Sequence, residues 1–212
     1  MKMNFKKSIL AVAAAFMLTA TSFAQFGGEI EFTKKVGSIE VHYKYYVSGD
    51  NVRVEEITDG KIEGVQLMDL DEGTMLAVSP ERKMYMEVPN KRPASDLDVE
   101  VDKTGKTKTI NGKKCEQIIV TCSDKDRKIE YWVAKGDYDF FIPMLKTLNR
   151  KENQSMFFME IPGMDGYFPM LSTETTLSDG TQVSELTAGK MTEKKLSKDM
   201  FEVPAGFSKF EK

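Results

Sequence analysis

The stretch IEVHYKYYVSGDNVRV, residues 39–54, decides the fold class of this chain. Apolar and polar side chains alternate along its first half, which is the pattern of a β-strand with one buried face. The turn residues SGDN follow, and the alternation resumes with Val52 and Val54. We therefore predict an antiparallel hairpin in which Val52 and Val54 lie on the buried face and Arg53 lies on the opposite face.

The same pattern of strand and turn recurs along most of the chain. The strongest turn signal is Asn111-Gly112, because both residues tolerate the positive φ that a tight hairpin requires. We predict strands near residues 28–36, 38–48, 51–58, 61–69, 74–79, 83–88, 98–103, 106–121, 128–134, 169–177 and 182–191. These strands form an antiparallel meander with one covered face.

One segment departs from the strand pattern and predicts helix. Apolar residues crowd together near 138–151, and a second short apolar piece lies near 154–159. We expect a single domain over residues 25–212 with a helical insertion near 138–160. The predicted fold class is α+β and mostly β, an antiparallel sheet whose apolar face is covered by helix.

The N-terminal residues have the three parts of a secretory signal peptide. Three lysines precede residue 8, an apolar stretch spans residues 9–18, and the small residues Ser22 and Ala24 precede a cleavage site before Gln25. The alternative, a membrane anchor, needs about 20 apolar residues, and this stretch is shorter. We expect residues 1–24 to be removed on export to the periplasm, with secretion as the alternative. No later segment is apolar enough to span a bilayer.

The charge of the chain excludes one class of partner. The net charge is −3, and acidic and basic residues are interspersed. Such a surface is typical of a solvated domain and not of a nucleic-acid binder. It also argues against docking on anionic lipid through charge alone.

The two cysteines, Cys115 and Cys122, are expected to stay unpaired. Both are predicted to lie on or near one strand, where seven residues cover about 23 Å. A disulfide needs Cα atoms about 5.5–6 Å apart. The odd separation also directs the two side chains to opposite faces.

Few residues suggest catalysis or metal binding. His42 is the only histidine and falls on the polar face of its strand, so a catalytic triad is not indicated. A zinc site needs three or four clustered ligands, which one histidine and two cysteines do not supply. The run Asp69-Leu70-Asp71-Glu72-Gly73 starts like a calcium loop but lacks the later ligands, and a hairpin turn explains it better. We expect no cofactor, no metal and no enzymatic activity.

The segment rich in methionine and phenylalanine has three interpretations. It is the core face of a covering helix, a mobile lid over an apolar cleft, or a thioether copper site. The lid interpretation rests on the adaptable shape of methionine, which suits exchangeable apolar ligands. The candidate ligand-binding residues are Trp132, Phe140, Phe141, Met144, Leu148, Met156, Phe157 and Met159.

Several motifs carry a family resemblance. In chain order they read YKYYVSGDNVRVE, MDLDEGTMLAVSPERKMYMEV, INGKKCEQIIV, IEYWVAKG and FEVPAGFSKFEK. With them the chain resembles an exported bacterial family of domains of unknown function, family 4412, which is similar to the lipoprotein carriers LolA and LolB and to the sensor domain of RseB. The resemblance implies an unclosed half-barrel with helices plugging its concave face, where the carriers hold acyl chains.

The resemblance does not place every functional residue of the carriers. The arginine that controls lid opening in LolA-type carriers has no counterpart by motif. Arg53 follows the first hairpin, but alternation places it on the face opposite Val52 and Val54.

Two functions follow as hypotheses. The first is an exported, non-enzymatic binder or carrier of an apolar ligand, a lipid or a lipidated protein. The second is a structural, interaction or sensor module of the cell envelope with a solid core. A continuous apolar cavity under residues 138–161 favours the first, and a filled core favours the second.

Overall fold

The computed structural model describes residues 25–90, 97–148 and 151–211. Within these ranges twelve strands form one sheet. They are β1 (Gly28–Val36), β2 (Ile39–Ser48), β3 (Asn51–Thr58), β4 (Lys61–Asp69), β5 (Thr74–Ser79), β6 (Met84–Glu87), β7 (Glu100–Ile110), β8 (Lys113–Cys122), β9 (Arg127–Lys135), β10 (Tyr167–Thr176), β11 (Gln182–Glu193) and β12 (Ser208–Lys209). The order across the sheet is β12-β6-β5-β4-β3-β2-β1-β11-β10-β9-β8-β7, and only β12 runs parallel to its neighbour.

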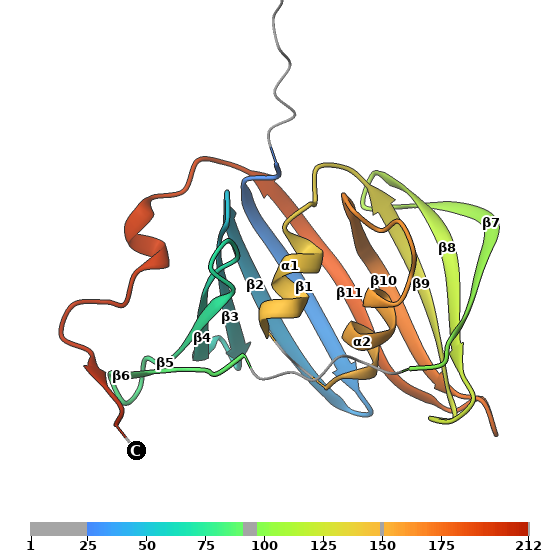
Figure 1. Cartoon of the computed structure of the whole chain (residues 1–212), viewed down its shortest axis with the longest axis horizontal. Coiled ribbons are helices and arrows are strands. Elements are labelled where there is room, and N and C mark those ends of the chain that lie inside the picture. Colours follow the sequence, from blue (N-terminus) through green and yellow to red (C-terminus); the bar gives the residue numbers. More distant parts are fainter. Residues whose placement is uncertain (1–24, 91–96, 149–150, 212) are drawn as a thin grey trace, which may run out of the picture.

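Two short helices, α1 (Phe141–Leu148) and α2 (Asn153–Met159), cover the concave face of this sheet. Figure 1 shows the sheet curving around them without closing. The predicted fold class, a mostly β domain with an unclosed curved sheet, is therefore confirmed. The helix predicted near 138–151 is shorter in the structure, and its residues 149–150 lie outside the described ranges.

The hairpin between β7 and β8 corrects one predicted strand. Residues 106–121 do not form a continuous strand, because Asn111 and Gly112 turn the chain with φ values of 47° and 74°. The side-chain amide of Asn111 donates to the carbonyl oxygens of Ala188 (2.7 Å) and Gly189 (3.1 Å) on β11. The hairpin tip therefore contacts a strand three places away in the sheet order, as strong curvature requires.

The core lies between the helices and the concave face. Val47, Val52 and Ile30 are fully buried there, as the alternation in β2 and β3 predicts. Ile39, at the other end of β2, is 65% exposed although it shares the alternation. The turn end of the β1–β2 hairpin thus lies beyond the region that the helices cover.

The C-terminal segment builds a second, smaller core on the outer face. Val65, Leu67 and Val78 are buried there against Val203 and Phe207. The segment includes the 3-10 helix η1 (Lys198–Phe201) and ends with β12 beside β6. In Figure 1 it descends from the end of β11 along the outside of the sheet. The sequence does not predict the strand β12, because two exposed residues carry no alternation.

The predicted signal peptide, residues 1–24, lies outside the described residues and stays a prediction. Among the residues that are described, none of the helices has the length and apolar character needed to cross a membrane.

Candidate functional site

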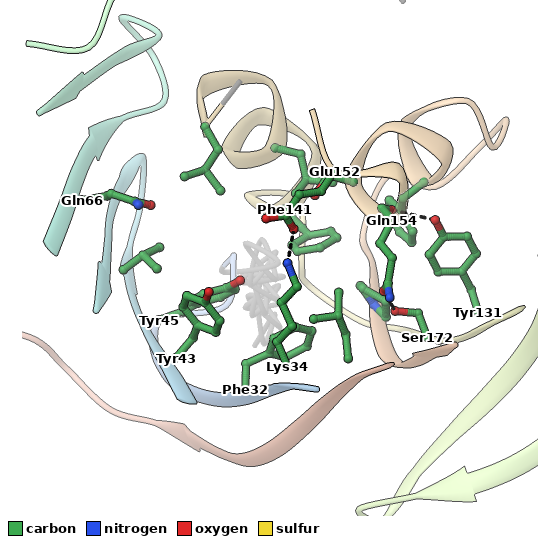
Figure 2. A pocket seen from close by; sticks show the side chains of 17 residues that line it. Phe32, Lys34, Tyr43, Tyr45, Gln66, Tyr131, Phe141, Glu152, Gln154 and Ser172 are labelled. Carbon is green, nitrogen blue, oxygen red and sulfur yellow. Dashed lines mark hydrogen bonds and ion pairs between the residues drawn. The ribbon is translucent and has the colours of Figure 1, made fainter. Parts of the chain in front are cut away.

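A small cavity lies between the concave face of the sheet and the two helices (Figure 2). Its volume is about 50 Å³. This cavity is the cleft referred to below. It is lined by Phe32, Lys34, Tyr43, Tyr45, Val54, Gln66, Tyr131, Phe141, Leu145, Leu148, Glu152, Gln154, Ser155, Phe158, Pro169, Ser172 and Leu186. They come from the sheet, both helices and the segment between the helices.

Aromatic rings form much of the cleft wall. Phe32 on β1 faces Tyr43 on β2 in register, and its ring stacks with that of Tyr45 at 5.8 Å between centroids. On the helical side the rings of Phe141 and Phe158 meet edge to face at 5.2 Å. Such ring pairs contribute stability beyond the area that they bury, and they make both walls largely apolar.

An ion pair links the sheet to the segment that precedes α2. The Lys34 ammonium lies 3.0 Å from the Glu152 carboxylate, and the two side chains are 21% and 37% exposed. Figure 2 shows this pair beside the cavity. A half-exposed pair contributes about 1 kcal/mol or less, so it orients the helical segment without locking it.

A buried hydrogen-bond network fixes α2 to the sheet. The Tyr131 hydroxyl donates to the carbonyl oxygen of Gln154 at 2.6 Å. The Gln154 side chain donates to Ser184 Oγ at 2.7 Å and accepts from the Ser172 hydroxyl. Burial raises the pKa of Tyr131 well above its usual value, so its hydroxyl stays protonated and remains a donor.

A buried carboxylate extends this network. Glu174 on β10 accepts hydrogen bonds from Ser184 Oγ and Asn153 Nδ2, both at 2.8 Å. Arg127 Nε lies 3.2 Å from the same carboxylate. The charge of Glu174 is therefore compensated although its side chain is only 8% exposed.

One polar atom of the cleft has no hydrogen-bond partner among the described residues. It is the amide oxygen Oε1 of Gln66, which is buried. Gln66 lies on β4 between Val65 and Leu67, whose side chains face the outer core. By alternation its own side chain faces inward, and Figure 2 shows it reaching toward the cleft.

The residues predicted to bind a ligand fall into three groups. Phe141 and Leu148 line the cleft. Phe140, Met144 and Phe157 are fully buried in the surrounding core and do not line it.

The third group, Met156, Met159 and Trp132, does not line the cleft either. The half-buried Met156 and Met159 pack against the core from α2. Trp132 is not brought to the cleft. It follows the cleft residue Tyr131 on β9 and so points to the other face, where its indole N–H donates to Glu130 (2.6 Å) and the Lys108 ammonium lies 4.0 Å from the ring centroid.

Most cleft residues of the sheet are not among the predicted site residues. The alternation of β2 places Tyr43 and Tyr45 on the covered face, which is the signal available for them. Lys34 and Gln66 carry no such signal, because a lysine or glutamine in a strand is usually solvent-facing. Their inward position depends on strand pairing, with Lys34 opposite Leu186 on β11.

Two residues considered for chemistry lie away from the cleft. His42 is 55% exposed and contacts Glu40 and Thr33. Arg53 lies on the outer face, as predicted, where it binds Glu55 through Nε and Nη2 at 2.8 and 2.7 Å and donates to the carbonyl oxygen of Met200. Within the described residues, no group of three histidine, cysteine, aspartate or glutamate side chains could hold a metal ion.

Comparison with known proteins gives one family match. The family described as a domain of unknown function, DUF4412, matches residues 26–207. No curated protein matches the chain.

Solved structures are similar to this chain at low sequence identity, and the first of those described here shares its fold. An uncharacterized conserved protein from Thermus thermophilus is 11% identical with a TM-score of 0.53, over 86% of this chain and 88% of that chain. MucB, solved in complex with MucA(peri), is 9% identical with a TM-score of 0.48, over 86% of this chain and 55% of that one. A LolA superfamily protein from Nitrosomonas europaea is 13% identical with a TM-score of 0.36, over 85% and 91%.

Proposed function

This chain belongs to the DUF4412 family of domains of unknown function, and we propose that it binds an apolar, chain-like ligand in the cleft. The ligand is a lipid or the acyl part of a lipidated protein, and no reaction is catalysed. The observation that carries the proposal is the cleft itself, an aromatic and aliphatic space between a curved sheet and two short helices. We place this activity in the periplasm, in line with the signal peptide predicted over residues 1–24.

The energetics of burial favour such a ligand. Each buried CH₂ group contributes about 0.8 kcal/mol. A twelve-carbon chain therefore gains roughly 9 kcal/mol before the costs of association are subtracted. No catalytic group is needed for this kind of binding.

The present volume implies that binding moves a helix. Ligand pockets have volumes of about 300–1,000 Å³, while the cleft measures about 50 Å³. Because α2 is held by the Gln154 network, we assign the movement to α1. Its residues Phe141, Leu145 and Leu148 contribute only apolar side chains to the helical wall of the cleft.

The test measures uptake of an acyl chain by the purified protein. A fluorescent fatty-acyl probe is titrated into protein prepared without detergent, and native mass spectrometry records the bound species. We expect one acyl chain bound per protein. Leu148→Lys should weaken binding at least tenfold, because a lysine ammonium there is desolvated when the acyl chain enters. Ile142→Lys on the same helix is the control, since Ile142 does not line the cleft.

A second candidate function is an interaction or sensor module with a solid core. The small cavity volume and the complete burial of Phe140 and Phe157 favour it. The same titration separates the two candidates. Protein that is isolated without lipid and takes up no probe would favour the solid module and contradict the binding proposal.

A further inference from the structure

Gln66 is a polar residue in an apolar setting. Its inward-facing neighbours are Val54, opposite it on β3, and Met68, two positions along β4, and each is 3% exposed. A valine or leucine at this position would continue the apolar wall. The amide instead brings one hydrogen-bond acceptor to the edge of the cleft, and that acceptor is buried without a partner among the described residues.

Buried acceptors in folded proteins are nearly always paired, with protein groups, water or a ligand. An acyl chain that enters the cleft displaces any water from the Gln66 amide. If the ligand presents only CH₂ groups there, the acceptor stays unpaired and binding is weakened. If it presents an N–H or O–H group, the acceptor is satisfied by the ligand itself.

We propose that the ligand of the cleft carries a hydrogen-bond donor beside its acyl chain and that Gln66 accepts from it. The donor is an amide N–H or a hydroxyl, so Gln66 selects amide-linked or hydroxylated chains over ester-linked ones, which offer only acceptors. This inference rests on the proposed function, because it specifies the chemistry of the ligand that the cleft binds.

Gln66 differs in this respect from the other polar groups of the cleft. Lys34 and Glu152 are paired with each other, and the Gln154 side chain is bonded to Ser172 and Ser184. These groups are engaged within the protein, so they do not require a ligand to satisfy them. The Gln66 acceptor has no partner among the described residues, so it does require a ligand to satisfy it.

Three probes with the same dodecanoyl chain test the proposal. They are N-methyldodecanamide, which has one N–H donor, N,N-dimethyldodecanamide, which has the amide carbonyl but no donor, and methyl dodecanoate, which has neither the amide nor a donor. Affinities come from displacement of the fluorescent acyl probe. We expect N-methyldodecanamide to bind about tenfold tighter than the other two, as one hydrogen bond provides.

Gln66→Leu should abolish this preference, and methyl dodecanoate should bind tighter than it does to the unsubstituted protein, because no buried acceptor is then left unpaired. Gln117→Leu is the matched control, because Gln117 is buried on β8 outside the cleft and bonded to Thr104. That variant should keep the tenfold preference. The comparison within the unsubstituted protein decides the question even if Gln66→Leu fails to fold.

Equal binding of the three probes by the unsubstituted protein would overturn the role of Gln66 while the proposed function stands. Binding of none of them, and of no fluorescent acyl probe, would overturn the proposed function and this inference with it.

Discussion

Glu29 lies on the outer face of β1 between two lysines. Its carboxylate is hydrogen-bonded to Lys194 and lies 2.9 Å from the Lys44 ammonium. The hydrogen bond to Lys194 is the main cause that lowers the pKa of Glu29 from its ordinary value, and Lys44 adds to it. A carboxylate whose pKa is lowered by folding contributes stability above its unfolded pKa and loses it as the pH falls through its folded pKa.

Glu29→Gln should therefore reduce stability at neutral pH and not in acid. We expect a loss of about 1 kcal/mol or less in the free energy of unfolding at pH 7. The difference from the unsubstituted protein should shrink in acid, as the pH falls through the lowered pKa of Glu29 and the carboxylate becomes protonated. Urea titrations at neutral pH and in acid measure it.

Glu31→Gln is the control for this prediction. Glu31 lies on the same strand but is 48% exposed and 3.9 Å from Lys44, so its removal should change stability little at any pH. A loss for Glu29→Gln that is the same at neutral and acidic pH would show that the ion pairs contribute nothing.

At the scale of elements, the position of α2 depends on its polar contacts with the sheet. Asn153 and Gln154 in its first turn are bonded to Glu174, Ser172 and Ser184 on β10 and β11. A seven-residue helix is not stable by itself, so its position is set by these contacts and by the burial of its two phenylalanines.

Glu174→Ala should destabilise the protein by about 3 kcal/mol, because it leaves the Arg127 guanidinium and two donors without their acceptor. The substitution should also accelerate amide hydrogen exchange more in α2 than in α1. Chemical denaturation and exchange mass spectrometry provide the two measurements.

Glu100→Ala on the edge strand β7 is the matched control, since Glu100 is exposed, and it should change stability by less than about 0.5 kcal/mol. If exchange in α2 were unaffected by Glu174→Ala, the helix would be held by its apolar face alone.

At the scale of the whole molecule, the C-terminal segment covers the outer face of β4 to β6. Phe207 packs on the small core of Val65, Leu67 and Val78, and the backbone N–H of Phe210 donates to the carbonyl oxygen of Tyr85. The segment thus protects part of the sheet edge, where β12 lies beside β6.

Phe207→Ala should lower the free energy of unfolding by about 2 kcal/mol, because the outer core loses its largest C-terminal side chain. Thermal and urea denaturation measure this loss. Phe210→Ala is the control, since its ring is 46% exposed and should contribute less than half as much. Equal effects of the two substitutions would contradict the assignment of Phe207 to the outer core.

Local patterns in the chain predict the fold well. Alternation places Val52, Val54 and Arg53 on their correct faces, and Asn111-Gly112 forms the expected hairpin. The structure leaves Cys115 and Cys122 free and buried on β8, and burial raises the pKa of Cys115. These features depend on neighbours in sequence, which is why they are predictable.

The composition of the cleft is not predictable in the same way. Phe140 and Phe141 are adjacent and equally apolar, yet only Phe141 lines the cleft, because the orientation of α1 on the sheet decides which of them faces it. Trp132 is predicted to bind the ligand but does not line the cleft. It follows Tyr131 on β9, so its side chain points to the other face of the sheet.

The sequence by itself determined the class of fold, the order of most strands and the place of the helical insertion, because strand alternation and turn chemistry act over a few residues. The tertiary structure alone decided which side chains meet around the cavity. Lys34 and Gln66 lie far apart in the chain and carry no local signal of burial. They line one cleft because β1 pairs with β11 and the sheet curves around two helices.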